Sequence, residues 1–160
     1  KEATKTVKEV GNEKNPLLNG VVEVFGDTDV YEAAPPADAT ILLRGIVLKG
    51  MNPTDEPAVY EKKSKGGAVQ KVNDPAMPVA WSREVKNEAG TTNKVLTTTM
   101  GAATDLVDED LRRLVVNGVF WGLGMEVPEK AEVSISDKFK PSKYGFTGSQ
   151  TGKKAADFVE

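Results

Sequence analysis

The stretch that decides the fold is Asn93–Met125, which reads NKVLTTTMGAATDLVDEDLRRLVVNGVFWGLGM. Threonines and branched residues in Lys94–Met100 favour an extended strand, and the small residues that follow favour a turn. Asp108 then offers a helix N-cap, and Glu109 and Asp110 place negative charge where the helix dipole favours it. A strand, a turn and an amphipathic helix in this order are typical of an α/β domain, in which ligands usually lie at such turns.

The helix is predicted over Asp108–Gly124, where Gly124 can end it in the left-handed conformation. Apolar residues recur at helical spacing and mark the face expected to be buried, namely Leu111, Leu114, Val115, Val119 and Phe120. Arg112 and Arg113 follow Asp108 and Glu109 at i,i+4 spacing, with the acid first. These two pairs predict a solvated face on the opposite side of the helix.

Strands are predicted over Val21–Phe25, Thr40–Leu48, Val79–Val85 and Lys94–Met100. Thr40–Leu48 (TILLRGIVL) is an almost continuous apolar run, which is typical of a strand buried on both faces of a parallel sheet. The sequence therefore predicts an α/β fold with a mostly parallel sheet and a flanking helix, of the glutamine-amidotransferase-like or flavodoxin-like kind.

The chain divides into three parts by composition. Residues 1–14 are a polar lead-in, residues 15–127 form the α/β domain, and residues 128–160 form an extended C-terminal tail. Within the domain, residues 49–78 contain four prolines, two adjacent glycines and a lysine cluster, which predicts a long insertion loop.

Composition excludes several classes of protein. The chain has 160 residues, a formal net charge of −3, and neither histidine nor cysteine. This charge gives no reason to expect nucleic acid as a partner, and no apolar run approaches the ~20 residues of a membrane helix. Thiolate metal sites, disulfides and histidine-based catalysis are excluded, and no glycine-rich phosphate pattern is present. We therefore expect no metal and no cofactor, while the compartment stays open.

Three segments together resemble the C-terminal part of the trehalose-utilisation (ThuA-like) family. They are NPLLNGVVEVFGDTDVYE at Asn15–Glu32, MPVAWSREV at Met77–Val85, and the stretch Lys94–Met125. The resemblance implies a class I glutamine-amidotransferase-like fold and a role in carbohydrate metabolism in bacteria, with a small sugar as the ligand.

The chain departs from this family in two ways. Relatives usually carry a histidine after the glycine at Gly101, where this chain has Ala102, and often have His-Pro at Asn15-Pro16. Chemistry that depends on those histidines is lost here. The family's first α/β half also has no counterpart, so the fold is expected to be incomplete. A missing N-terminal half or a homo-oligomer would then cover an exposed sheet edge.

Candidate binding residues fall into four groups, and the first three each have a structural alternative. Asp29 and Tyr31 lie in an acidic loop that either binds a hard cation or sugar hydroxyls, or is simply solvated. Arg44 interrupts an apolar strand, so it either pairs with Asp27 or Asp29 or contacts a ligand. Trp81 and Arg83 share one face of a strand, where they either stack a sugar or belong to the core and its edge.

The last group is the turn itself, with Thr99, Gly101 and Ala102. Its backbone N–H groups can hold an oxyanion near the start of the helix. No catalytic residue is identified, because no histidine is available to activate a serine or threonine.

Two functions follow as expectations. The first is a ThuA-like domain of trehalose-type sugar utilisation, with catalytic activity unproven, for which we expect a concave patch with an exposed aromatic and convergent acids. The second is a non-catalytic binding or interaction module on the same scaffold, for which we expect the same residues to be tied up in salt bridges.

Overall fold

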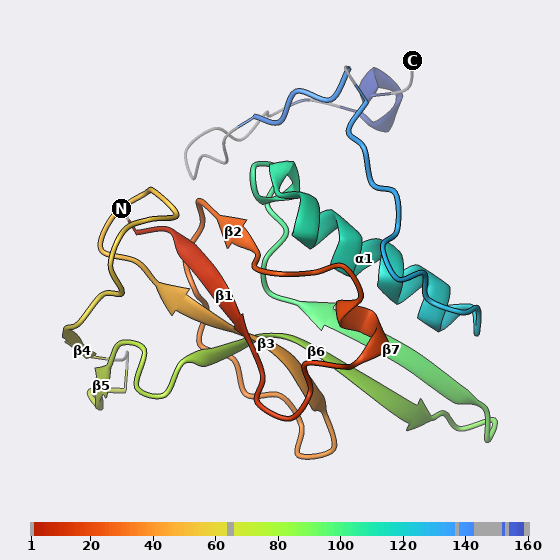
Figure 1. Cartoon of the computed structure of the whole chain (residues 1–160), viewed down its shortest axis with the longest axis horizontal. Coiled ribbons are helices and arrows are strands. Elements are labelled where there is room, and N and C mark those ends of the chain that lie inside the picture. Colours follow the sequence, from red (N-terminus) through yellow and green to blue (C-terminus); the bar gives the residue numbers. More distant parts are fainter. Residues whose placement is uncertain (1, 64–65, 137, 143–151, 153, 159–160) are drawn as a thin grey trace.

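The computed structural model describes residues 2–63, 66–136, 138–142, 152 and 154–158. Its main body is a five-stranded sheet in the order β2-β1-β3-β6-β7, covered on one face by a single long helix, α1 (Figure 1). The strands are β1 (Thr4–Lys8), β2 (Phe25–Gly26), β3 (Thr40–Val47), β6 (Met77–Lys86) and β7 (Thr92–Thr98).

Shorter elements complete the described chain. The strands β4 (Glu61–Lys63) and β5 (Val69–Lys71) form a separate two-stranded sheet. Three 3-10 helices occur, η1 (Pro16–Leu18), η2 (Asp105–Val107) and η3 (Ala155–Phe158), and α1 spans Glu109–Gly122.

Every pair of neighbouring strands in the main sheet is antiparallel, so the predicted mostly parallel sheet is wrong. A parallel pair needs a long crossover, usually a helix, between its strands. Here α1 follows the last strand, so it cannot connect two strands of the sheet. The strands β6 and β7 are joined by a short turn in which Asn87 exchanges hydrogen bonds with Thr91 and Gly90 has φ +79°.

The predicted lead-in contains a strand that lies inside the sheet. Thr4 and Thr6 of β1 are buried, and β1 pairs with β3 on one side and β2 on the other. Val24 N–H donates to the Thr6 hydroxyl at 2.9 Å, and the Thr6 N–H donates to the Val24 carbonyl at 3.0 Å. A polar strand is tolerated there because its buried hydroxyls find such partners.

The predicted helix is confirmed, with Asp108 as its N-cap accepting from Leu111 N–H at 2.9 Å. Its buried face differs in part from the prediction. Leu111 and Leu114 are buried, but Val119 is 56% exposed. The helix also contacts the sheet at Gly118, which lies so close to the Leu96 side chain of β7 that an added Cβ would clash with it.

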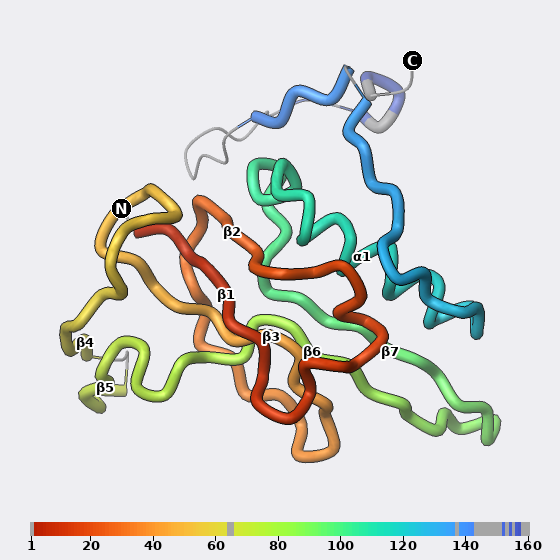
Figure 2. Tube along the Cα trace, viewed as in Figure 1, coloured from red at the N-terminus to blue at the C-terminus, as the bar shows by residue number. Residues whose placement is uncertain are grey.

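The core lies between α1, the segment that contains η1, and the sheet. Figure 2 shows this early segment running beside the helix although the two lie far apart in sequence. Register irregularities in the β3–β6 pairing place adjacent residues of both strands in the core. The core residues are Leu17, Leu18, Val21, Val24, Leu42, Leu43, Val79, Ala80, Met100, Leu111 and Leu114.

Candidate functional site

The loop that follows β2, Asp27–Glu32, is fixed at its start by hydroxyl contacts. Asp27 accepts from the Thr104 hydroxyl at 2.6 Å, and the Thr28 hydroxyl donates to Asp105 at 2.7 Å. Thr4 in turn donates its hydroxyl to the Thr28 carbonyl at 2.7 Å. The first half of the loop is therefore tied to β1 and η2, and the second half, Asp29–Glu32, lines a cleft.

We call this hollow the Asp29 cleft, and it has a volume of about 430 Å³. Its walls come from two residues just before β1, from the Asp29–Glu32 loop, from the end of β3, and from β4 with the residue before it. It is lined by Glu2, Ala3, Asp29, Val30, Tyr31, Glu32, Val47, Tyr60 and Lys62. Tyr31 is 62% exposed, so its ring is open to solvent.

Tyr60 is held in the Asp29 cleft by a short hydrogen bond. Its hydroxyl donates to Glu2 Oε2 at 2.6 Å. This bond, followed by burial and by the charges of Glu2 and Asp29, raises the pKa of Tyr60 to about 12. Tyr60 therefore stays protonated and neutral at physiological pH. Glu32 accepts at Oε1 from Gln70 Nε2 at 3.0 Å, which links the loop to β5.

Asp29 and Tyr31, which the sequence singles out, both line the Asp29 cleft, and the structure adds neighbours that sequence reasoning missed. Tyr60 and Lys62 come from the predicted insertion loop, and Glu2 comes from the predicted lead-in. An aromatic residue in a proline-rich stretch was the one available signal for Tyr60. Sequence spacing alone does not show which sheet edge such a stretch approaches.

Arg44 lies outside the Asp29 cleft, and its partner is Glu9, which corrects the predicted pairing with Asp27 or Asp29. Its Nη2 donates to Glu9 Oε1 at 3.0 Å, its Nε pairs with the other Glu9 oxygen, and its Nη1 donates to the Ala76 carbonyl at 2.9 Å. The pairing follows from strand register, because Lys8 lies opposite Leu43 and the chain continues from there to Glu9.

Trp81 and Arg83 also lie away from the Asp29 cleft, on β6. Arg83 makes a bidentate pair with Asp38, with both N–O distances at 2.9 Å. Hydrogen bonding to Arg83 lowers the pKa of the Asp38 carboxyl. Trp81 is half-buried and lies opposite Ile41 and Thr97 on the neighbouring strands. Trp81 is not part of the core cluster among the described residues, and Arg83 is engaged by Asp38.

The turn after β7 holds an internal carboxylate at the place where an oxyanion was predicted. Gly101 and Ala102 each donate a backbone N–H to Asp105 Oδ2 at 3.2 Å. Thr99 continues the strand by donating its N–H to the Val79 carbonyl at 2.9 Å. Asp105 is only 1% exposed, so these two amides are already engaged and closed to solvent on that side.

The second oxygen of Asp105, Oδ1, is buried without a hydrogen-bond partner among the described residues. It lies against Gly26, where a Cβ would come within 2.6 Å of it. Gly26 is therefore required by close approach, since a larger residue would displace the carboxylate that holds the turn.

A second hollow of about 450 Å³ lies between β2 and the start of α1. Its lining is mostly apolar and consists of Phe25, Gly26, Asp27, Thr104, Val107 and Asp108. Burial raises the pKa of the Asp108 carboxyl. Both Asp108 oxygens already accept backbone N–H groups, from Leu111 at 2.9 Å and Phe25 at 3.2 Å, so this carboxylate has little acceptor capacity left for a ligand in the hollow.

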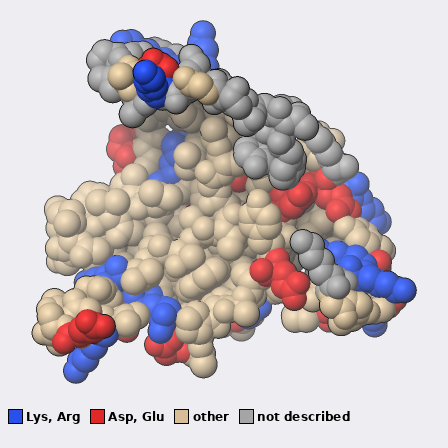
Figure 3. All heavy atoms as spheres, turned by 180° about the vertical axis from the view of Figure 1, so that it is seen from behind, with Lys and Arg blue, Asp and Glu red and all other residues tan. Residues whose placement is uncertain are grey.

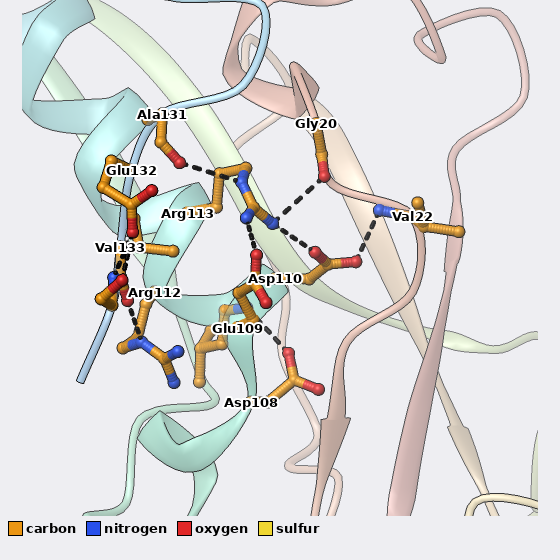
Figure 4. A network of polar contacts seen from close by, with 12 residues as sticks. Gly20, Val22, Asp108, Glu109, Asp110, Arg112, Arg113, Ala131, Glu132 and Val133 are labelled. Carbon is orange, nitrogen blue, oxygen red and sulfur yellow. Dashed lines mark hydrogen bonds and ion pairs between the residues drawn. The ribbon is translucent and has the colours of Figure 1, made fainter.

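Arg112 and Arg113 form a buried polar network, which corrects the predicted solvated face (Figure 4). The Arg113 side chain is only 3% exposed, contacts Glu109 and lies 2.6 Å from Asp110. It also donates to carbonyls on either side of the helix, Gly20 at 3.3 Å and Ala131 at 3.2 Å. The helix is covered from two sides there, so a face that looks polar in sequence is enclosed.

Arg112 links the segments before and after the helix through hydrogen bonds to backbone carbonyls. It donates to the carbonyls of Val133, Leu106 and Val107, each at 2.8 Å, and not to Asp108. Asp110 Oδ2 accepts from Val22 N–H at 2.7 Å and holds the early segment against the helix start. These contacts give both arginines a structural role.

Charge is distributed unevenly over the surface. Seen from behind, the middle of the molecule is made of uncharged residues, and the Lys, Arg, Asp and Glu side chains lie around it (Figure 3). Within the described ranges, no three acidic side chains are placed to hold a metal ion. Of the helices in the described part of the chain, none has the length and apolar character needed to cross a membrane.

Among the described residues, the Asp29 cleft thus brings three carboxylates and an exposed aromatic ring to one hollow. Comparison of the chain with protein-family models, with curated proteins and with solved structures gave no match.

Proposed function

We propose that this chain is a sugar-binding domain related to ThuA-like proteins of trehalose-type sugar utilisation, and that its site is the Asp29 cleft. The observation that carries the proposal is the combination of an exposed Tyr31 with three carboxylates, Glu2, Asp29 and Glu32, around one hollow. The family relationship rests on the three motifs in the sequence, and it does not extend to a parallel sheet.

The chemistry of the cleft suits a small polyol. Carboxylate oxygens accept strong hydrogen bonds from hydroxyl groups, and an aromatic ring offers an apolar surface to the C–H face of a sugar. A volume of about 430 Å³ lies within the usual range for small-ligand sites. The buried Ala3 at the base of the hollow supplies an apolar floor. The proposal concerns binding, and catalytic turnover forms no part of it.

The test is a titration of the isotope-labelled chain with trehalose and with glucose, followed by nuclear magnetic resonance. Resonances of Asp29, Tyr31 and Tyr60 should shift in a saturable way. Tyr31→Ala should weaken binding by about tenfold or more, since the stacking surface is lost, while Tyr31→Phe should retain most of it. Shifts spread over the whole surface, or no saturable shifts, would exclude a sugar site here.

A second candidate is an interaction module without a small ligand, and it has its own supporting observation. Arg44 and Arg83 are engaged in ion pairs, and the turn amides of Gly101 and Ala102 are engaged by Asp105. Nothing in the described ranges pairs with the outer edge of β7. Unpaired edges can accept a further strand, from a second copy or from a missing half of the protein.

Sedimentation equilibrium tests whether a second copy of the chain binds at the β7 edge. A concentration-dependent dimer whose formation protects the β7 amides from hydrogen exchange would favour the interaction module. A monomer at every concentration would remove self-association through β7 from consideration.

A further inference from the structure

We infer that the Asp29 cleft selects a cationic saccharide, such as an amino sugar with a protonated amine, over the corresponding neutral sugar. This inference rests on the proposed sugar-binding function and specifies its ligand class. It is carried by the balance of charge and of hydrogen-bonding groups within the hollow.

Charge within the cleft is negative in excess. Among the described residues, three carboxylates line it, Glu2, Asp29 and Glu32, against one ammonium group, Lys62. Tyr60 adds no charge of its own, because its hydroxyl remains neutral and donates its hydrogen bond to Glu2. A ligand that enters this hollow therefore meets a negative potential, which a cation would relieve.

Hydrogen-bonding capacity in the cleft is also one-sided. Glu2 uses Oε2 for Tyr60 and Glu32 uses Oε1 for Gln70, which leaves the other oxygen of each without a partner among the described residues. Asp29 has no side-chain hydrogen bond within the same ranges, although its charge acts on Tyr60. The cleft thus offers acceptors, and a ligand rich in donors fits it best, with an ammonium group as the strongest donor.

A bare metal ion is a poorer fit than an organic cation. Metal sites need several oxygen atoms converging on one point, and the described residues contain no group of three acids so placed. The carboxylates are instead spread around a hollow that has an apolar floor, at Ala3 and Val47, and an exposed tyrosine at its rim. Such a shape suits a ring with apolar C–H faces, and a cation can also contact the Tyr31 ring.

The experiment is a calorimetric titration of the 160-residue chain with glucosamine and with glucose. It is done at about pH 6, where carboxylates are ionised and an amine is protonated. We expect glucosamine to bind about tenfold more tightly, with a preference that shrinks as salt is added. Asp29→Asn should reduce this preference. Lys62→Gln should increase the preference for glucosamine, since it removes a positive charge that opposes the carboxylates.

Glu88→Gln is the matched control, because Glu88 is an exposed acid in the β6–β7 turn and does not line the cleft. It removes the same charge as Asp29→Asn from a remote position and should leave the preference unchanged. If glucose binds as tightly as glucosamine, the inference is overturned while the sugar-binding function stands. If neither sugar binds, the proposed function fails and the inference fails with it. Because Lys62 lies on an exposed strand, its variant tests the charge argument without disturbing the core.

Discussion

Arg113 is a charged side chain that the fold encloses almost completely, so we expect its removal to have a large effect on stability. Its guanidinium lies between two acids of its own helix and two carbonyls from segments on either side. Arg113→Ala would leave Asp110 and the two carbonyls without their donor. We expect a loss of about 3 kcal/mol in the free energy of unfolding, measured by urea denaturation.

Arg83 provides the comparison for this prediction. It also pairs with an acid, but Asp38 is well exposed, so water can replace the arginine. Arg83→Ala should shift the urea midpoint only slightly. Equal losses from the two substitutions would contradict the view that enclosure, and not the ion pair itself, makes Arg113 important.

Asp108 gives a second prediction at the residue scale, one that depends on pH. Burial raises the pKa of its carboxyl above the ordinary value of 3.8, so the folded state holds this proton more tightly than the unfolded state. Its ionisation therefore costs stability as the pH rises from about the unfolded pKa through the raised folded pKa. Asp108→Asn removes this titration.

The measurement is the difference in unfolding free energy between the two proteins from about pH 3 to pH 7. Relative to Asp108→Asn, the natural chain should lose stability as the pH rises through that window. A difference that is constant across the range would show that Asp108 has an ordinary pKa.

At the scale of elements, the contact between α1 and β7 turns on Gly118. Alanine usually stabilises a helix interior relative to glycine by about 1 kcal/mol. Here a Cβ would lie 2.3 Å from Leu96 Cδ2, so the leucine must move. We expect Gly118→Ala to destabilise the chain, and we expect the same change to stabilise it when Leu96 is already alanine.

A double-mutant cycle with thermal denaturation measures this coupling. The variants are Gly118→Ala, Leu96→Ala and their combination. Additive effects would mean that the helix and the strand can separate slightly at no cost. The close packing of Gly118 against Leu96 argues against this outcome.

The sequence predicted these elements unequally well, for physical reasons. The helix carries its own signals, so its N-cap at Asp108 was identified correctly. Three of the strands were also located, but their direction was not, because an apolar run such as Thr40–Leu48 occurs in both parallel and antiparallel sheets. The order of elements held the missing information, since α1 follows β7 and no helix lies between β3 and β6.

The residues of the candidate site were also predicted only in part. Asp29 and Tyr31 were singled out because acids and an aromatic lie together in one short loop. Tyr60 and Lys62 approach them through tertiary folding, and nothing local in their sequence indicates that approach. Arg44 was expected to need a partner, which is correct, but the identity of Glu9 depends on strand register.

At the scale of the whole molecule, stability should be distributed unevenly. The hairpin of β4 and β5 is mostly exposed, while β3 is flanked by strands on both sides and contributes Leu42 and Leu43 to the core. Hydrogen exchange of amides should therefore be fast in β4 and β5 and slowest in β3 and β6. Mass spectrometry after a deuterium pulse would check this, and uniform protection across both sheets would contradict it.

The enclosure of Arg113 also has a consequence for how the chain matures. Its carbonyl partners belong to Gly20 and Ala131, and Arg112 likewise depends on Val133. On the ribosome, the sheet and the helix emerge before these last acceptors do. The two guanidinium groups then have no complete set of partners, so the helix cannot dock at full strength until residue 133 has left the exit tunnel. Nascent chains that stall before residue 133 has emerged should remain open to proteases, and chains that stall well beyond it should resist them.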